Sequence, residues 1–436
     1  MSSFAPWRFP HLFTLWQDWL NNGQGQQLDR WLRNWFANHK AYGKKDRMAY
    51  AQEIFSAMRV LQLANALELS YRKGEQDWAA FDANWHSDDA AKVPPAAFWY
   101  WVMLRYDADA LPSKDLSDAA ERLAHFKQCA RSWSQLDKLQ PENLIWFGIR
   151  PQWLADLQQR AKASGWDQTT LCRFIEQQIS QPPVWLRCQQ GKTPAQLFPV
   201  LQQQGLNVSL ENNLLAVRGG TGILETQAYK DGLIEIQDAA SQQIAAAVKV
   251  QPGQKVWDTC AGGGGKSLAI ASHMAGKGVL VATDIREYKL NEVKKRAKRA
   301  GYFHIRTFAW DASAPLQLPR EVAQQQGFDW TLIDAPCSSA GTWRRNPDAR
   351  WWLADDLSEL LALQSKIMQQ AAPAVRAGGH LVYATCSWKV EENEQRVQLF
   401  LAQNSDFTLV SQTMLGCPDV DADAMFVAVM QKKAHS

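Results

Sequence analysis

Two short segments of the chain each place a cysteine directly after an apolar run that resembles a β-strand. One is Asp334-Ala335-Pro336-Cys337, and the other is Thr385-Cys386-Ser387. Because the carboxyl ends of parallel strands meet at one edge of a sheet, we expect both thiols to lie at that edge. A lone cysteine in such a place is usually a packing residue, but two of them, one near a carboxylate, favour covalent chemistry.

The reaction that would use two thiols and a carboxylate is methylation of a pyrimidine at carbon 5. That carbon is a weak nucleophile, so a thiolate must add to carbon 6 and push electron density onto carbon 5. A base then removes the carbon-5 proton so that the thiolate can leave, and a carboxylic acid stabilises the charge that builds up on the ring. This chemistry alone does not decide which of the two cysteines attacks.

A glycine-rich loop follows another predicted strand. The strand 255–258 leads into Thr259–Ser267, with the sequence TCAGGGGKS, and then into a helix. Backbone N–H groups and the positive end of the helix dipole bind ligands at such a turn. A P-loop would need glycine where Cys260 stands, which disfavours ATP hydrolysis, and a dinucleotide fingerprint fits only loosely.

Four carboxylates end consecutive predicted strands: Asp258, Asp284, Asp311 and Asp334. A carboxylate at the position of Asp284 can accept hydrogen bonds from both hydroxyls of a ribose. A helix cap would explain Asp284 alone, but it does not explain the series. Four acidic groups at strand ends suit an adenosine with a cationic group better than a polyphosphate, and they favour S-adenosylmethionine as the ligand.

The elements that must position these residues alternate between strand and helix from about residue 233 onward. Strands are predicted at 255–258, 279–284, 305–309, 330–334 and 380–385. The alternation indicates an α/β fold with a doubly wound, Rossmann-like parallel sheet over 233–436. A ligand would then bind at the carboxyl ends of the strands.

Two other domains are predicted before the sheet. Apolar residues at helical spacing indicate an all-helical domain over 1–140, where Trp16, Trp19, Trp31 and Trp35 mark helix faces. Packing is favoured over base stacking for these tryptophans. A small α+β domain is predicted over 141–232, with helices at 153–164, 168–180 and 194–204 and strands at 184–187 and 214–218.

Composition excludes several protein classes. The chain has 436 residues and a net charge of +3, from 47 Lys and Arg against 44 Asp and Glu, which is typical of a globular protein and not of collagen or a disordered chain. Any nucleic-acid surface must therefore be local. Seven cysteines do not indicate a disulfide framework, so we expect a reducing cytoplasm. No signal peptide or membrane-spanning run is recognised.

Five motifs, in order over about residues 180–430, resemble those of the Sun-type (RsmB-like) RNA 5-methylcytosine methyltransferases. They are Ile236–Ser241, Asp258–Ser267, Asp334–Thr342, Arg344–Asp348, and Thr385–Ser387 with Glu391–Glu394. Two weaker similarities extend the resemblance. The stretch Lys44–Arg59 looks like the NusB-like helical domain of the rRNA-modifying members, and Asp423–Phe426 is similar to the family's last strand.

The resemblance implies a class I methyltransferase fold and a role for each reacting residue. Cys386 matches the nucleophile, and Cys337 matches the cysteine that assists release of the methylated base. Asp334 would contact both the cytosine and the cofactor. No metal is implied.

The resemblance also assigns the cofactor site. Asp284 would bind the ribose and Asp311 the adenine, and the loop residues would surround the methionine part: Cys260, Ala261, Gly262, Gly263, Gly264, Gly265 and Lys266. The family usually has Ala-Pro where this chain has Gly262-Gly263, and a proline is common at Val390. Since glycine frees the backbone that proline fixes, we expect weaker cofactor affinity or a more mobile loop.

Basic residues near the predicted site indicate where RNA phosphates would bind. We expect contacts from Lys294 and Lys295 and from Arg344, Arg345 and Arg350. A solvated helix face is the alternative for the two lysines.

The predicted function is methylation of carbon 5 of a cytosine in RNA by a cytoplasmic, monomeric enzyme. Small-subunit ribosomal RNA is preferred over transfer RNA because of the NusB-like resemblance. Two alternatives stay open. One is a non-catalytic RNA-binding or ribosome-assembly factor that keeps the fold, and the other is a transfer-RNA cytosine methyltransferase.

Overall fold

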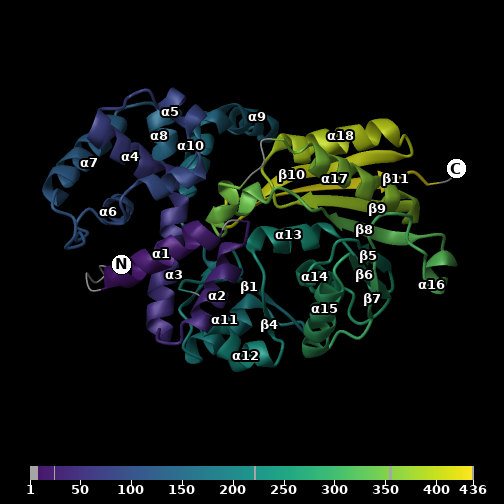
Figure 1. The fold of residues 1–436 in the computed structure, drawn as a ribbon. Helices are drawn as coiled ribbons and strands as arrows, with labels where there is room; N and C mark the ends of the chain where they lie inside the picture. The colour runs from purple at the N-terminus through teal and green to yellow at the C-terminus, as the bar shows by residue number, and fades with distance from the viewer. Residues whose placement is uncertain (1–7, 24, 220–221, 353–355, 435–436) are drawn as a thin grey trace. The chain divides into compact units, whose positions relative to one another are not determined.

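The computed structural model describes residues 8–23, 25–219, 222–352 and 356–434, drawn as a ribbon in Figure 1. These residues form two compact units. The first consists of the described parts of Met1–Gln181 and Trp343–Leu353, and the second of the described parts of Pro182–Thr342 and Ala354–Ser436. A short segment from late in the chain therefore belongs to the first unit.

The first unit is helical, as the spacing of its apolar residues predicts. Its helices are α1 (Phe9–Asn22), α2 (Leu28–Asn38), α3 (Lys44–Arg59), α4 (Leu61–Lys73), α5 (Trp78–Asn84), α6 (Pro95–Tyr106), α7 (Ala119–Trp133), α8 (Pro141–Trp146), α9 (Leu154–Ser164) and α10 (Gln168–Gln177). Trp19 and Trp31 meet edge to face with ring centroids 5.2 Å apart. Both are buried, as are Trp16 and Trp35, so these side chains form core and not a surface for stacking bases.

The described part of the late segment, residues 343–352, is held in this unit by two buried arginines. Arg344 donates from Nε and Nη2 to the carbonyl and the hydroxyl of Ser180, at 3.2 and 2.9 Å. Arg350 donates from Nη1 to the Arg59 carbonyl at 3.1 Å and from Nη2 to the Gln178 carbonyl at 3.0 Å. Because both guanidiniums are buried and bonded to backbone, they anchor the segment among the helices.

The two units divide the chain differently from the domains predicted at 1–140, 141–232 and 233–436. Helices α9 and α10, expected in the small mixed domain, belong to the helical unit, and the strands after them belong with the large sheet. The boundary falls at Pro182. Helical spacing predicts that a segment is a helix but not which core it joins, so the sequence did not indicate this boundary.

The second unit begins with a small antiparallel sheet in the order β2-β3-β1-β4. Its elements are β1 (Val184–Cys188), α11 (Pro194–Gln203), β2 (Val208–Glu211), β3 (Leu214–Val217), α12 (Gln227–Lys230) and β4 (Ile234–Ile236). The strands predicted at 184–187 and 214–218 and the helix predicted at 194–204 are confirmed. This sheet has a hydrophobic core of its own, to which α11 contributes Leu197 and Leu201.

The larger sheet has the order β10-β11-β9-β8-β5-β6-β7. Its strands are β5 (Lys255–Asp258), β6 (Val279–Asp284), β7 (Ile305–Ala309), β8 (Phe328–Asp334), β9 (Val375–Thr385), β10 (Phe407–Gly416) and β11 (Ala424–Lys432). Strands β5 to β9 pair in parallel, which confirms the Rossmann-like prediction. The sheet is mixed and not wholly parallel, because β10 and β11 form an antiparallel hairpin beside β9.

Helices cover both faces of this sheet (Figure 1). They are α13 (Ala239–Ala247), α14 (Gly265–His273), α15 (Glu287–Ala300), α16 (Arg320–Ala323), α17 (Ser358–Ala371) and α18 (Glu394–Gln403). Val256 packs into the cluster with α13 and α14, whereas its neighbour Trp257 packs into the cluster with α17 and α18. Successive side chains of a strand point to opposite faces, so a buried parallel strand is apolar on both.

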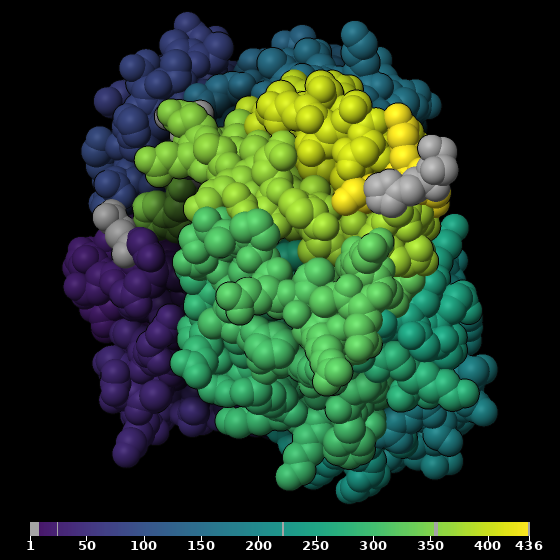
Figure 2. Space-filling model, turned by 90° about the vertical axis from the view of Figure 1, so that its right-hand side faces the viewer, coloured from purple at the N-terminus to yellow at the C-terminus, as the bar shows by residue number. Residues whose placement is uncertain are grey.

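Strand β7 is an edge of the sheet, paired on one side with β6. Phe308 in this strand is 43% exposed, and Ile285, directly after β6, is 70% exposed. Figure 2 looks onto the face where the segment that carries β7 and α16 (green) lies at the surface, beside the C-terminal strands (yellow). Within the described ranges of the chain, no helix is long and apolar enough to cross a membrane.

Arg350 offers a test of this arrangement. We expect Arg350→Met to lower the free energy of unfolding by about 3 kcal/mol or more, since it leaves the buried carbonyls of Arg59, Gly148 and Gln178 without their donor. Urea unfolding followed by tryptophan fluorescence measures the loss. Arg30→Met, at an exposed position of the same unit, is the control and should change the value by less than about 0.5 kcal/mol. Equal effects of the two substitutions would contradict the anchoring role.

Candidate active site

The pairing of the parallel strands brings the predicted site residues to one edge of the large sheet. Asp258 of β5 lies opposite Ala282 of β6 and Leu332 of β8, and Asp334 of β8 lies opposite Ala384 of β9. The loops that leave these strands therefore start side by side. They carry the glycines and both cysteines.

The glycine loop runs from β5 into α14 with two residues in the left-handed region. Gly262 has φ of 53°, and Gly264, which caps α14, has φ of 83°. The Gly262 N–H donates to Asp284 Oδ2 at 2.9 Å, and the Gly263 carbonyl accepts from Arg296. A residue before proline is pushed toward extended backbone, so the family's Ala-Pro pair would not take this conformation. The glycine pair thus permits a loop shape of its own.

A cavity of about 480 Å³ lies beside this loop. Its lining includes five of the predicted cofactor residues: Cys260, Gly262, Asp284, Asp311 and Asp334. The rest of the wall comes from Thr259, Ile285, Arg286, Trp310, Ala312, Ala335, Pro336, Leu363 and Ile367. The other predicted cofactor residues, Ala261, Gly263, Gly264, Gly265 and Lys266, are not part of the lining. The structure thus brings three of the four carboxylates together around one apolar-walled space.

The acidic residues of the cavity differ in their partners. Asp284 is almost fully buried, and its Oδ1 accepts from the backbone N–H and the Nε of Arg286, at 2.9 and 3.1 Å. Asp311 is exposed and accepts from the Ser313 N–H at 2.9 Å. Burial raises the pKa of the Cys260 thiol to about 12, so this cysteine is a neutral part of the wall.

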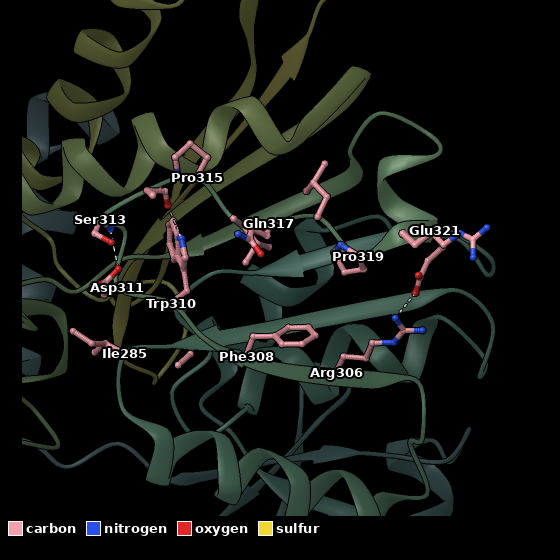
Figure 3. Close-up of a pocket in the computed structure, with 15 residues that line it drawn as sticks. Ile285, Arg306, Phe308, Trp310, Asp311, Ser313, Pro315, Gln317, Pro319 and Glu321 are labelled. Carbon is pink, nitrogen blue, oxygen red and sulfur yellow. Dashed lines mark hydrogen bonds and ion pairs between the residues drawn. The ribbon is translucent and has the colours of Figure 1, made fainter.

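A second, wider hollow of about 980 Å³ shares Ile285, Trp310 and Asp311 with the first (Figure 3). Phe308 lies along its floor, and an ion pair between Arg306 and Glu321 closes one end. The residues after Asp311, including Pro315 and Pro319, form the opposite wall (Figure 3). The cavity therefore adjoins the wider hollow at Asp311.

Asp334 is paired with a lysine that the sequence assigned only to the methionine part of the cofactor. Lys266 Nζ donates to Asp334 Oδ2 at 2.7 Å. Burial acts to lower the pKa of Lys266, but the adjacent Asp334 carboxylate outweighs it and the pKa is raised. The lysine thus stays protonated beside the carboxylate of Asp334.

The two cysteines touch. Cys337 Sγ and Cys386 Sγ are 3.1 Å apart, and Cys386 Sγ also donates to Ser339 Oγ at 3.5 Å. The hydrogen bond between the thiols raises the pKa of Cys337 and lowers the pKa of Cys386. The first proton of the pair therefore leaves Cys386, which is the favoured thiolate.

One functional candidate escaped the sequence reasoning. Glu392 lies in the Glu391–Glu394 motif, but no role follows from its position in the sequence. In the structure its carboxylate is fully buried and accepts hydrogen bonds from Ser338 and Ser387, which follow the two cysteines. Since glutamate is rarely buried, only the three-dimensional structure could single it out.

The predicted RNA-binding residues separate into two groups. Lys294 and Lys295 are exposed on α15, whose other side packs on the sheet. Arg344 and Arg350, however, are buried in the helical unit and bond to its backbone, which does not support the prediction that they contact phosphates. Arg345 is half-buried in the same segment. Basic residues beside a motif looked like a binding surface, whereas their charge is used for internal hydrogen bonds.

Asp258, at the end of β5, is the most deeply buried acid near the cavity. Ser267 Oγ donates to its Oδ2 at 2.5 Å, and its Oδ1 has no hydrogen-bond partner among the described residues. Burial raises the pKa of this carboxyl to about 7. Its role is therefore structural, beneath the loop and not in the cavity wall.

Comparison with known proteins agrees with this geometry. Residues 245–430 match the family model described as 16S rRNA methyltransferase RsmB/F. "Ribosomal RNA small subunit methyltransferase B" of Citrobacter koseri is 31% identical over 297 residues, which cover 65% of this chain and 67% of the relative. The protein of the same name from Salmonella paratyphi B is 33% identical over 305 residues, with the same coverage of 65% and 67%.

Solved structures share the fold. The protein PH0851 superposes with a TM-score of 0.68 over 92% of this chain and 93% of its own, at 21% identity. A methyltransferase homologue from Pyrococcus horikoshii gives a TM-score of 0.51 at 24% identity, over 63% of this chain and 98% of its own.

The raised pKa of Asp258 predicts a dependence of stability on pH. Because the folded protein binds this proton up to about pH 7 and the unfolded chain loses it near about pH 3.9, stability should fall as the pH rises between these values. Asp258→Asn removes the charge. Its free energy of unfolding relative to wild type should rise by up to about 4 kcal/mol from pH 4 to pH 8.

Urea unfolding at each pH measures this difference, and Asp406→Asn, at an exposed site of the same unit, is the control. A difference between Asp258→Asn and wild type that does not change with pH would contradict the burial of an ionisable carboxyl here.

Proposed function

Because the chain belongs to the RsmB/F family of 16S rRNA methyltransferases, we propose that it methylates carbon 5 of a cytosine in small-subunit ribosomal RNA through a covalent adduct of Cys386. The observation that carries the proposal is the contact between Cys337 and Cys386, beside Asp334, at the edge of a cavity of about 480 Å³. The resemblance to the Sun-type family in the sequence points the same way. S-adenosylmethionine is the methyl donor of this family.

The residues of the cavity fit that cofactor. Carboxylates suit its hydroxyls, its amines and its positive charge, and three of them line the space. Asp284 would hold the ribose and Asp311 the adenine, while Cys260 and Gly262 would enclose the methionine part. Bound there, S-adenosylmethionine supplies an electrophilic methyl group.

Cys386 would act as the nucleophile. Its lowered pKa makes it the thiolate of the pair, and a thiolate can add to carbon 6 of the cytosine. The addition turns carbon 5 into the nucleophile that takes the methyl group. A thiol that kept its proton would not make this attack at a useful rate.

Cys337 would assist the second half of the reaction. While Cys386 is a thiolate, the negative charge 3.1 Å away keeps the proton on Cys337. Once Cys386 has formed its bond to carbon 6, that charge is gone and Cys337 can more easily lose its proton. A Cys337 thiolate could then accept the carbon-5 proton, after which the bond to Cys386 breaks.

Asp334 and Lys266 would stabilise the charge on the base. Asp334 lies at the end of β8, three residues before Cys337, and in its acid form the carboxyl group can donate a hydrogen bond to the ring nitrogen beside the exocyclic amine. Lys266, 2.7 Å from that carboxylate, would hold its orientation. The pair gives the site a fixed dipole before the substrate binds.

The two alternative functions have less support. The departure from the family at Gly262-Gly263 would fit a non-catalytic factor, but the reacting groups Cys337, Cys386 and Asp334 are all present and lie together. A transfer-RNA substrate lacks support from the relatives, whose names refer to ribosomal RNA. We further propose that the enzyme works as a monomer in the cytoplasm.

The roles of the two cysteines can be separated. We expect Cys386→Ala to abolish methyl transfer, since no thiolate can add to carbon 6. Cys337→Ala should retain the addition, lower turnover, and accumulate a protein–RNA adduct that survives denaturing electrophoresis. An assay with radiolabelled S-adenosylmethionine and small-subunit RNA measures both. An adduct formed by Cys386→Ala and not by Cys337→Ala would reverse the roles.

The exposed lysines of α15 provide a test of RNA binding. Removing a lysine that binds a phosphate should reduce the slope of log affinity against log salt by about 0.7 for single-stranded RNA, because one fewer counterion is released. The double variant Lys294→Ala with Lys295→Ala should therefore bind more weakly and with a shallower slope, as measured by fluorescence anisotropy. Lys277→Ala, exposed just before β6 at the opposite end of that strand, is the control. An unchanged slope in the double variant would remove these lysines from the interface.

A further inference from the structure

A buried carboxylate lies between the two cysteine loops and has no part in the reaction described above. Glu392 ends the short 3₁₀ helix Val390–Glu392 and has no exposed surface. Its Oε1 accepts from the Ser338 N–H at 2.8 Å and from Gln364 Nε2 at 3.0 Å. Its Oε2 accepts from the hydroxyls of Ser338 and Ser387. All of these donors are neutral.

The two serines link this carboxylate to both reacting sulfurs. Ser338 directly follows Cys337, and Ser387 directly follows Cys386. The two serine hydroxyls are 3.1 Å apart, and so are the two sulfurs. A single carboxylate therefore holds both loops at the residue that follows each cysteine. The distance between the two sulfurs depends on this carboxylate.

The glutamate is itself fixed from two further elements. Gln364 of α17 donates from Nε2 to the Pro336 carbonyl at 3.1 Å, as well as to the carboxylate, so it holds the residue on the other side of Cys337. Tyr383 of β9 donates from its hydroxyl to the backbone carbonyl of Glu392 at 2.7 Å. Hydrogen bonds from α17 and from β9 thus hold both the side chain and the backbone of Glu392 in place.

Hydrogen bonding alone does not explain a charge at this position. No Lys or Arg in the described part of the chain forms an ion pair with Glu392, and a carboxylate buried among neutral donors is costly. A glutamine has the same shape and could keep most of these contacts, because the serine hydroxyls can also accept. The negative charge lies within hydrogen-bond distance of Ser338, the residue directly after Cys337, and it raises the pKa of the Cys337 thiol.

The charged and titratable groups around the thiols are unevenly distributed. Asp334 and Lys266 act on Cys386 in opposite directions: the carboxylate raises the pKa of that thiol and the lysine lowers it. Glu392 acts on Cys337, where it adds to the larger effect of the contact with Cys386 and raises the pKa further. Tyr383, packed beside them, has a pKa raised well above its usual value by burial, so it stays neutral, although the charge of Arg396 on α18 acts in the opposite direction.

We propose that Glu392 is the positioning residue of the cysteine pair: it holds the Cys337 and Cys386 loops together, and its charge keeps the shared proton on Cys337 so that Cys386 is the thiolate. The proposal rests on the proposed function for its consequence in catalysis. The order in which the thiols ionise is a property of the free protein and can be measured without RNA.

The experiment compares alkylation of the two cysteines in the free protein. Iodoacetamide is added over a series of pH values, and the rate at each cysteine is read by peptide mass spectrometry. In the wild type Cys386 should react at lower pH than Cys337. In Glu392→Gln the rate at Cys337 near neutral pH should rise by about tenfold, because removing the neighbouring negative charge favours the Cys337 thiolate.

Matched variants separate charge from structure. Glu391→Gln changes the neighbouring glutamate, which is half-buried and paired with Lys389 at 3.3 Å, and it should leave both alkylation rates unchanged. The double variant Ser338→Ala with Ser387→Ala removes both hydroxyl contacts of the bridge, leaves the bond from the Ser338 N–H to the carboxylate, and keeps the charge. It should lower kcat, leave the KM for S-adenosylmethionine unchanged, and preserve the order of alkylation. If Glu392 had only a structural role, the double serine variant would change the order of alkylation in the same way as Glu392→Gln.

Two results would overturn the proposal. One is a wild-type order of alkylation in folded Glu392→Gln, which would mean that the charge has no effect on the thiols. The other is full kcat in the double serine variant, which would mean that the bridge does not position them. If wild-type Cys386 is alkylated first but forms no adduct with RNA, the proposed function fails while the role of Glu392 in the thiol pair stands.

Discussion

The register between β8 and β9 is the constraint on which the site depends. Asp334 is paired with Ala384, and the N–H of the next residue, Ala335, donates to the Ala384 carbonyl at 2.9 Å. The two cysteine loops leave the sheet directly after this pair. A shift of one residue would turn every side chain of one strand to the opposite face, and the sulfurs, now 3.1 Å apart, would separate.

The buried charged groups of this protein differ in the partners that compensate their charge. Lys266 is matched by Asp334, whereas Asp258 has only a serine partner, and its pKa of about 7 reflects this. Glu392 is surrounded by neutral donors, and Arg350 by backbone carbonyls. Full compensation keeps a group ionised, while partial compensation moves its proton equilibrium or that of its neighbour. The thiol pair is only partly compensated, so its proton equilibrium is shifted.

Much of the fold could be predicted because the large sheet is local in sequence. The strands predicted at 255–258, 279–284 and 305–309 have the observed bounds, and the others differ only at their first residues. Three of the four carboxylates at strand ends line one cavity as expected, whereas Asp258 is not part of its wall. Long-range burial could not be predicted. Nothing in the sequence distinguishes Arg350, bonded to carbonyls of distant helices, from an arginine that faces solvent, and nothing indicates that Glu392 is buried.

The most direct test of the account is to trap the reaction on RNA that carries 5-fluorocytosine. A base can remove a proton from carbon 5 but not fluorine, so the enzyme should stop at the methylated adduct after the thiolate has added. Peptide mass spectrometry of wild-type protein incubated with this RNA and S-adenosylmethionine identifies the attached residue. The account predicts the modified base and its methyl group on Cys386. Attachment to Cys337, or no adduct under conditions in which ordinary RNA is methylated, would contradict it.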